Sequence, residues 1–322
     1  MQKHHTYLAC ALVSLSAAVP STRAALTFEF NYLPGSGFLD ESFGAARQAA
    51  LHQAANIFGS YFTAYSANLT FTVGEETVPT ALASANSPLA GSPLSSGLYN
   101  TVVQEKILTG WDDNGAAADG FINWNFSFDW NLGPVNAPEA TGQPNLIPTA
   151  LHELTHTLGF GLIADADVVN FAVWSGLLTN RFGTPLFALS PEERASTIVG
   201  GSSLDGEGNL VPSLNGVYFA GENAVTQNGD LVPIYSPSQF VDGSSLSHLD
   251  VLATGIQNMM DPFSLNPENE PLGYSALEIA MLKDLGYTQI NSSAIPEPAQ
   301  AGVLAGLVTL CLAVLPRRRA RA

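Results

Sequence analysis

Two histidines and a glutamate stand at a spacing that suits catalytic metal chemistry. Residues 152–160 read HELTHTLGF, which places His152 and His156 four positions apart with Glu153 beside the first. On a helix, side chains four residues apart lie on the same face, so both imidazoles can reach one metal ion. The carboxylate stays free to handle water. The pattern therefore predicts a zinc-hydrolase site on a helix that ends near Gly159.

The third ligand is the open question in this motif, because a tetrahedral catalytic zinc takes three protein ligands and leaves its fourth position to water. Apart from two histidines at the extreme N-terminus, the sequence offers His52 and His248. His52 lies in a segment with helical periodicity and is expected to be a partly exposed helix residue, so His248 is the preferred candidate. Four carboxylates remain as alternatives: Asp165 and Asp167, which closely follow the motif, and Glu192 and Glu193, which stand in a sequence typical of a capped helix start.

With these residues the chain resembles the metzincin metallopeptidases, in which HExxHxxG is followed by a third ligand and then by a methionine turn beneath the zinc. The common short form would place that ligand at position 162, which is Leu162 here. The chain is more similar to the leishmanolysin-like branch, which has a long insertion before the third histidine. Residues 260–262, Met-Asp-Pro, resemble the Met-x-Pro turn of the family. The resemblance implies zinc ligands at His152, His156 and His248 and a methionine turn at Met259 and Met260.

The same resemblance implies an α+β fold of two subdomains, with a mixed sheet, an active-site helix and the methionine turn. We interpret residues 25–295 as the metallopeptidase domain and about 161–242 as an insertion that helps to wall the active-site cleft. Ahead of the motif helix, apolar periodicity predicts a strand over 26–32, a helix over about 42–61, a strand over 68–73 and a strand-like segment beginning at Trp124. After the methionine turn it predicts a helix over 274–286.

The predicted activity is zinc-dependent hydrolysis of peptide bonds in a protein or peptide substrate. Zinc lowers the pKa of its water, and Glu153 takes the proton as that water attacks the peptide carbonyl. The alternative is a non-catalytic surface or extracellular-matrix protein with a structural or degenerate zinc site. Glu153 argues against this alternative, because a purely structural zinc site has no use for a free carboxylate beside its ligands.

Both ends of the chain have the composition of targeting segments. Residues 1–24 have a lysine, an apolar run and a small residue at the end, which predicts a secretory signal peptide. Residues 296–322 combine Pro-Glu-Pro, a short apolar stretch and an arginine cluster, and they resemble a PEP-CTERM sorting tail with a short transmembrane helix. The resemblance implies an exosortase-type processing enzyme as a partner, membrane attachment through the tail before processing, and export across the inner membrane of a Gram-negative bacterium to the cell surface or extracellular matrix. A plain tail anchor is the alternative.

Charge and cysteine content narrow the possible partners and cofactors. The net charge is −17, and only five of the 11 Lys and Arg lie between the two end segments, so nucleic-acid binding is effectively excluded. Both cysteines, Cys10 and Cys311, lie in the end segments, so the exported body has no disulfide. Calcium is a further candidate cofactor, in an oxygen-rich loop whose spacing matches no defined site: Asp112, Asp113, Asn114 and Asp119.

Overall fold

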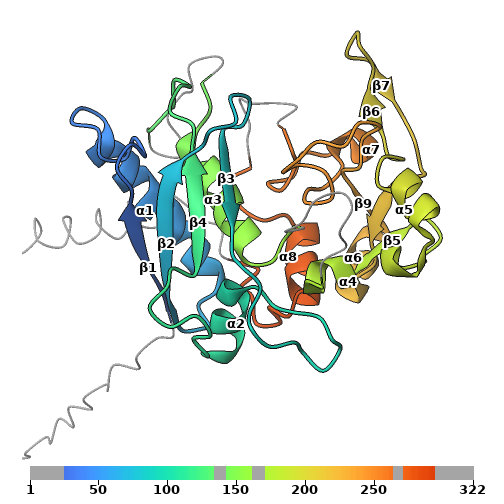
Figure 1. Ribbon diagram of the computed structural model, residues 1–322, viewed down its shortest axis with the longest axis horizontal. Helices are drawn as coiled ribbons and strands as arrows, with labels where there is room; N and C mark the ends of the chain where they lie inside the picture. Colours follow the sequence, from blue (N-terminus) through green and yellow to red (C-terminus); the bar gives the residue numbers. More distant parts are fainter. Residues whose placement is uncertain (1–24, 134–142, 162–170, 264–270, 294–322) are drawn as a thin grey trace, which may run out of the picture.

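The computed structural model describes residues 25–133, 143–161, 171–263 and 271–293 (Figure 1). The predicted signal peptide, the predicted sorting tail, and the alternative ligands Asp165 and Asp167 lie outside these residues. Within them, no helix combines the length and the apolar character that crossing a membrane requires.

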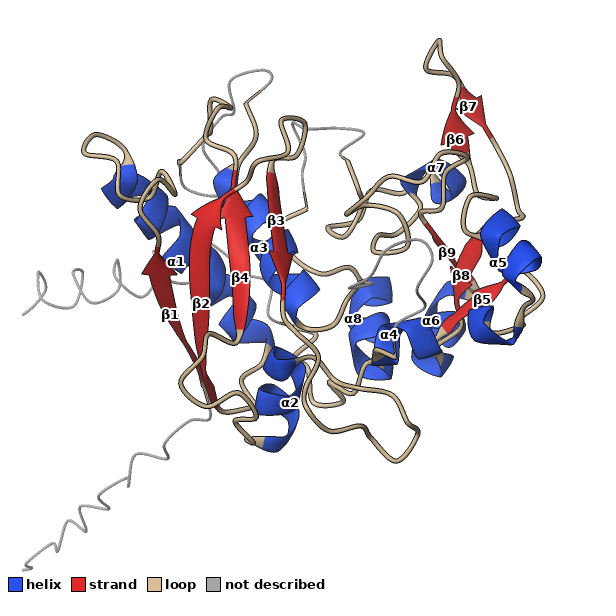
Figure 2. Ribbon diagram, viewed as in Figure 1, coloured by secondary structure: helices blue, strands red, loops and turns tan. Residues whose placement is uncertain are grey.

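A four-stranded mixed sheet forms the N-terminal lobe, in the order β1-β2-β4-β3. Its strands are β1 (Leu26–Tyr32), β2 (Ala67–Glu75), β3 (Ala83–Asn86) and β4 (Gly120–Trp124). The first two and β4 run parallel, whereas β3 pairs with β4 in the antiparallel direction. Helix α1 (Gly44–Tyr61) makes the crossover that the parallel pair β1 and β2 requires, and it packs against α3 (Leu146–Thr157) (Figures 1 and 2). The prediction of an α+β protein with a mixed sheet is confirmed.

The prediction of a strand that begins at Trp124 is wrong, because strand β4 ends at this residue. The chain turns at Asn125, whose side-chain oxygen accepts a hydrogen bond from the Ser127 N–H at 3.0 Å. The indole of Trp130 also donates back to the Asn125 carbonyl at 2.9 Å. Local side-chain bonding of this kind competes with a strand ladder. The alternating aromatic residues therefore pack as a cluster, with the Trp124 and Trp130 rings 5.2 Å apart.

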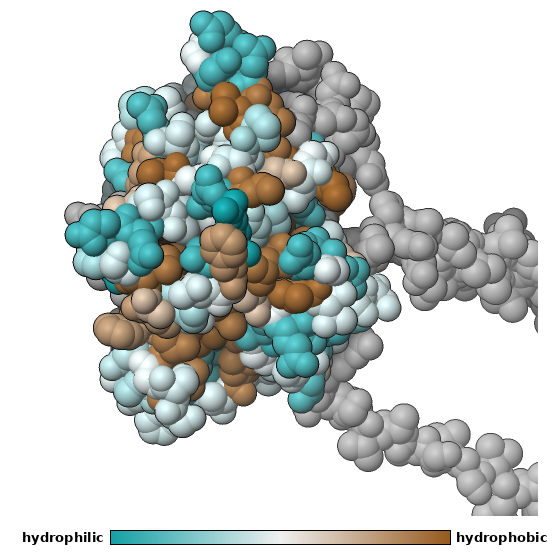
Figure 3. Space-filling model, turned by 90° about the vertical axis from the view of Figure 1, so that its right-hand side faces the viewer, coloured by the Kyte–Doolittle hydropathy of each residue, from teal (hydrophilic) through white to brown (hydrophobic). Residues whose placement is uncertain are grey.

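Residues 171–242, the described part of the predicted insertion, form most of the second lobe, which lies on the other side of the molecule from the N-terminal sheet (Figure 1). Its core is a three-stranded antiparallel sheet of β5 (Leu178–Asn180), β8 (Val217–Phe219) and β9 (Val232–Ile234). Around it lie α4 (Val173–Gly176), η1 (Leu186–Ala188), α5 (Pro191–Thr197) and α6 (Glu222–Asn228). The hairpin of β6 (Ser203–Leu204) and β7 (Leu210–Val211) projects from this lobe with a hydrophilic tip (Figure 3).

Helix α8 (Ala276–Asp284) lies between the two lobes and bonds to both (Figure 1). The Asp284 carboxylate accepts hydrogen bonds from the Asn223 and Ala224 N–H groups at the start of α6, at 2.9 and 2.8 Å. Toward the N-terminal lobe, the Leu285 carbonyl accepts a hydrogen bond of 2.6 Å from Gln104 in α2 (Val102–Thr109). The helix predicted over 274–286 is thus confirmed in position, and it connects the insertion with the rest of the fold.

Candidate metal centre

The zinc-motif helix α3 owes its start and its end to local sequence. The Asn145 side chain accepts a hydrogen bond from the Ile147 N–H at 3.2 Å and so caps the helix. The chain leaves the helix through Gly159, whose φ of +84° favours glycine. Between these ends His152 and His156 lie one turn apart, with ring centroids separated by 4.8 Å. The predicted helix and its end near Gly159 are confirmed.

His248 lies in an irregular segment that the insertion holds in place. The segment is adjacent to β9, because the Tyr235 N–H donates to the His248 carbonyl at 2.9 Å and the Leu246 N–H donates to the Tyr235 carbonyl at 2.8 Å. Leu246 has a φ of 66°, a left-handed conformation that is uncommon for a residue with a side chain. Its carbonyl accepts a 2.9 Å hydrogen bond from the buried indole of Trp174. A strained backbone held by tertiary contacts is typical of functional sites.

The three predicted ligands converge on one point between the two lobes. The Nε2 atom of His152 lies 3.1 Å from those of both His156 and His248, and the third Nε2 pair is 3.2 Å apart. A tetrahedral ion with metal–nitrogen distances of about 2.0–2.1 Å would hold its ligand nitrogens roughly 3.3–3.4 Å apart. The three side chains are therefore close enough to bind one metal ion.

The hydrogen-bond partner of Nδ1 in each histidine ring determines which tautomer is present. Each Nδ1 atom faces a backbone carbonyl oxygen: Met259 for His152 at 2.6 Å, Phe160 for His156 at 2.7 Å and Ser244 for His248 at 2.8 Å. A carbonyl oxygen can only accept, so Nδ1 carries the hydrogen and Nε2 carries a lone pair. Three lone pairs pointing at one another repel unless a cation lies between them. Carbonyls behind ligating imidazoles are also typical of metal sites.

The protonation state of the three rings agrees with this arrangement. Burial lowers the pKa of His152 to about 4, and burial together with the His152 charge lowers the pKa of His156 to about 3. Burial and the same mutual repulsion lower the pKa of His248 well below its usual value. All three imidazoles are consequently neutral near pH 7, which is the form that binds metals.

Glu153 provides a buried carboxyl group beside the ligands, on the same helix. Burial, together with the negative charge of Glu76, raises the pKa of Glu153 to about 8. A divalent cation held by the histidines would favour the carboxylate and oppose this shift. The group can therefore both accept and release a proton near neutral pH.

A turn is present at Met259 and Met260, where the sequence predicts the methionine turn, and both methionines are buried. The Met259 carbonyl accepts the hydrogen bond from His152, as described above. The Met260 carbonyl accepts a hydrogen bond of 2.9 Å from the N–H of Leu249, the neighbour of His248. The turn thereby connects the helical ligands with the loop-borne ligand.

The competing ligands that the structure describes lie elsewhere. His52 is an exposed residue of helix α1, as predicted, and its ring centroid lies 5.2 Å from that of Phe30. Glu193 caps the first turn of α5 by accepting a hydrogen bond from the Ser190 N–H at 3.0 Å, and Glu192 is exposed in the same turn. Neither glutamate belongs to a group of converging metal-binding side chains.

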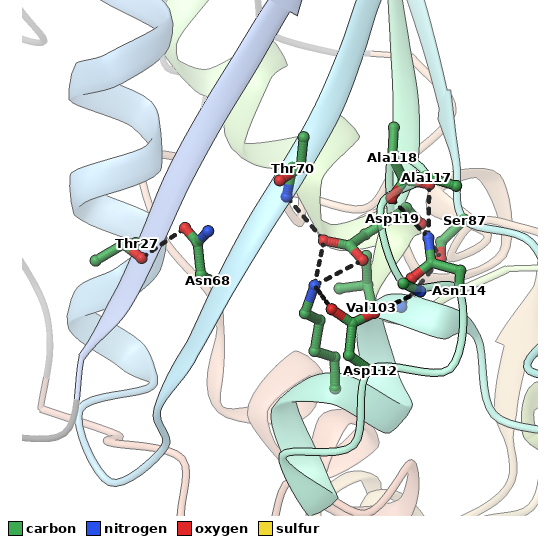
Figure 4. A network of polar contacts seen from close by, with 12 residues as sticks. Thr27, Asn68, Thr70, Ser87, Val103, Asp112, Asn114, Ala117, Ala118 and Asp119 are labelled. Atoms are coloured by element: carbon green, nitrogen blue, oxygen red, sulfur yellow. Dashed lines mark hydrogen bonds and ion pairs between the residues drawn. The ribbon is translucent and has the colours of Figure 1, made fainter.

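The calcium hypothesis finds no support, because a lysine ammonium already lies between the acidic side chains of the loop. Lys106 Nζ lies 3.0 Å from both Asp112 Oδ2 and Asp119 Oδ1. Asp119 also accepts a hydrogen bond from the Thr70 N–H, and the amide nitrogen of Asn114 donates within its own loop (Figure 4). In the described part of the chain these residues form no group of converging metal ligands.

Several residues that shape the centre could not be recognised from the sequence. Trp174 and Leu246 hold the His248 segment, and Glu278 accepts a hydrogen bond from the Met260 N–H at 2.7 Å. For Glu278 the sequence carries a partial signal, since Ser275 three residues earlier makes a capping box. Its second contact, with the methionine turn, depends on the tertiary structure.

Comparisons with known proteins identify no relative of this chain. No protein-family model matches the chain, and neither the curated proteins nor the solved structures contain a match. The functional argument therefore depends on the residues of the centre.

Proposed function

We propose that this protein is an exported zinc-dependent endopeptidase of the metzincin type, with the long insertion of the leishmanolysin-like branch. One observation carries the proposal: His152, His156 and His248 bring three unprotonated Nε2 atoms within 3.1–3.2 Å of one another. Three neutral imidazoles with a carboxyl group beside them suit a catalytic zinc site, which keeps one coordination position open.

The catalytic role falls to Glu153. When bound, zinc would supply Lewis-acid chemistry, polarising a water molecule and the carbonyl of the substrate. Glu153 accepts the proton of the attacking water and then returns it to the leaving amine. Burial raises the pKa of Glu153 and a bound cation would lower it. The two effects oppose each other, which suits a group that must first accept a proton and then release it.

A peptide substrate suits the sheet beside the centre. Strand β3 is the last strand of the sheet order and packs against α3. It also lies on the side of the sheet that faces the second lobe (Figure 1). The free edge of such a strand can pair with an extended peptide through main-chain hydrogen bonds. This favours peptide hydrolysis over hydrolysis of small metabolites.

Export and processing form the other part of the proposal, and they depend on the end segments. We expect a mature chain that lacks residues 1–24 and has lost or processed the tail after Pro298. Intact-mass analysis of the protein from its own cells tests this. A mature chain that still carries the terminal arginines would indicate a permanent membrane anchor.

The decisive experiment on activity is Glu153→Gln. The variant keeps all three ligands, so we expect wild-type zinc content, but casein hydrolysis should fall by about 10²–10⁴-fold because the base is lost. Glu192→Gln, a change in an exposed carboxylate far from the ligands in sequence, is the control and should retain both properties. Zinc content by plasma mass spectrometry and a casein assay measure the two. Bound zinc without hydrolysis in the wild type would favour the non-catalytic surface protein.

A further inference from the structure

Glu278 is a buried carboxylate of α8 with two kinds of partner. One oxygen, Oε2, accepts a hydrogen bond from the Ser275 N–H at 2.6 Å, and the Glu278 N–H donates to Ser275 Oγ at 3.2 Å. These two bonds form a capping box at the start of the helix. The other oxygen, Oε1, accepts a hydrogen bond from the Met260 N–H at 2.7 Å. The Glu278 side chain is fully buried.

The segment that Glu278 holds is the methionine turn, which bonds to both halves of the metal centre. The Met259 carbonyl, 2.6 Å from His152 Nδ1, orients the first helical ligand. The Met260 carbonyl accepts the Leu249 N–H at 2.9 Å and so fixes the residue after His248. Hydrogen bonds and the backbone of the turn thus connect Glu278 with His152 and with the residue that follows His248.

A carboxylate suits this position because both of its oxygens accept hydrogen bonds here. A glutamine would offer one oxygen and one NH₂ group, and the NH₂ group would face a backbone N–H. An N–H without an acceptor in a buried place is costly. The turn would then have to move, and the Met259 carbonyl would move with it.

We propose that Glu278 is a positioning residue of the metal centre, which fixes the methionine turn so that its carbonyls hold His152 and the His248 segment in ligating geometry. The inference rests on the proposed metal site, but it does not depend on peptidase activity. It gives α8 a role in metal binding in addition to its role in joining the two lobes.

The chain offers a matched control in Glu193. This residue makes the same capping box on α5, with the Ser190 N–H bonded to Glu193 Oε2 at 3.0 Å and the Glu193 N–H bonded to Ser190 Oγ at 3.2 Å. It is exposed and belongs to no metal-binding group. Glu193→Gln and Glu278→Gln therefore change the same kind of cap, and only the second reaches the methionine turn.

The test uses Co²⁺ bound to the full-length protein, because its visible absorption bands report the geometry of the ligands. We expect Glu278→Gln to weaken Co²⁺ binding by about 10–100-fold, as loss of an outer-shell partner does, and to change the bands. Glu193→Gln and Ser275→Ala should retain the affinity and the spectrum, since both leave the Glu278–Met260 bond in place. A folded Glu278→Gln variant with the wild-type affinity and spectrum would overturn the proposal.

Two further outcomes separate this inference from the proposed function. If Glu278→Gln does not fold, Glu278→Asp decides instead, because it keeps the charge but is one methylene too short to hold both partners. A wild-type spectrum and affinity in a folded Glu278→Asp variant would contradict the role. Wild-type protein that binds neither Zn²⁺ nor Co²⁺ would refute the metal centre itself, whereas metal binding without casein hydrolysis would leave the positioning role intact and refute only the peptidase.

Discussion

The two halves of the metal centre are built in different ways. His152 and His156 lie on one capped helix, and their separation follows from the helical repeat. His248 lies on a loop after the predicted insertion. Tyr235 and Trp174 donate hydrogen bonds to its segment, and the Met260 carbonyl of the methionine turn accepts one from it. A local element thus supplies two candidate ligands, and long-range contacts bring the third into place. Substitutions of residues around the helical half should therefore lower zinc affinity less than substitutions around the loop-borne half.

Removing a ligand from either half should have the largest effect. His156→Ala and His248→Ala each leave two imidazoles, so zinc affinity should fall by more than the roughly 100-fold that loss of an outer-shell partner causes. Isothermal titration with zinc measures this. Wild-type affinity in His248→Ala would place the third ligand elsewhere. Variants of the four alternative carboxylates should retain zinc: Asp165→Ala, Asp167→Ala, Glu192→Ala and Glu193→Ala.

The methionine turn should make the stability of the metal-free protein depend on pH. Asp261 accepts a hydrogen bond from the Asn258 N–H at 2.6 Å, and burial together with the charge of Glu278 raises its pKa to about 8. Because the folded state binds this proton more tightly than the unfolded state, stability falls as the pH rises from about 4 toward 8. The slope while the group titrates reaches about 1.4 kcal/mol per pH unit.

Urea unfolding at pH 5 and pH 8 checks this dependence. Asp261→Asn should lose less stability than the wild type between the two pH values. Glu153→Gln should also lose less, because burial raises the pKa of Glu153 in the helical half as well. Asp205→Asn is the control, because hydrogen bonds from Asn209 lower the pKa of Asp205 and it is already ionised at pH 5. An unchanged slope in Asp261→Asn would exclude this origin.

Two buried indoles test how far His248 depends on its supports. Trp174→Phe removes the hydrogen bond to the Leu246 carbonyl and should cost about 1–3 kcal/mol of unfolding free energy, with zinc affinity lowered by roughly 10-fold. Trp130 makes the same type of bond to the Asn125 carbonyl, in the N-terminal lobe. Trp130→Phe should therefore lower stability by a similar amount and leave zinc affinity unchanged. Equal affinities in both variants would mean that Trp174 does not support the ligand.

The smallest effects should come from the helix caps in the two halves. Asn145 caps α3, and Asp250 caps α7 (Val251–Thr254) by accepting the Leu252 and Ala253 N–H groups, each at 3.0 Å. Replacing either by alanine should cost about 1 kcal/mol in thermal unfolding. Zinc affinity should fall only in Asp250→Ala, because its cap lies two residues after His248. Equal losses of affinity would remove the distinction between the halves.

The sequence predicted the elements whose signals are local. The helix of HELTHTLGF, its end at Gly159, strands β1 and β2 and the helix before Gly286 agree with the structure, because hydrophobic periodicity and capping residues act over a few positions. The strand predicted over Trp124 to Trp130 is absent. Alternating aromatic residues suit a strand and an aromatic cluster beside a turn equally well, so the pattern cannot separate the two. The side-chain bond of Asn125 decided between them.

The sequence by itself determined that His152, His156 and the carboxyl group of Glu153 lie close together, because one helical turn fixes their spacing whatever surrounds the helix. It favoured His248 as the third ligand by setting aside His52 and through a resemblance, since nothing local connects residues so far apart. The tertiary structure decided that His248 reaches the other two histidines, that Lys106 occupies the acidic loop, and that Glu278 holds the methionine turn. Each of these contacts joins separate segments, and such contacts form only when the packing of the whole fold brings those segments together.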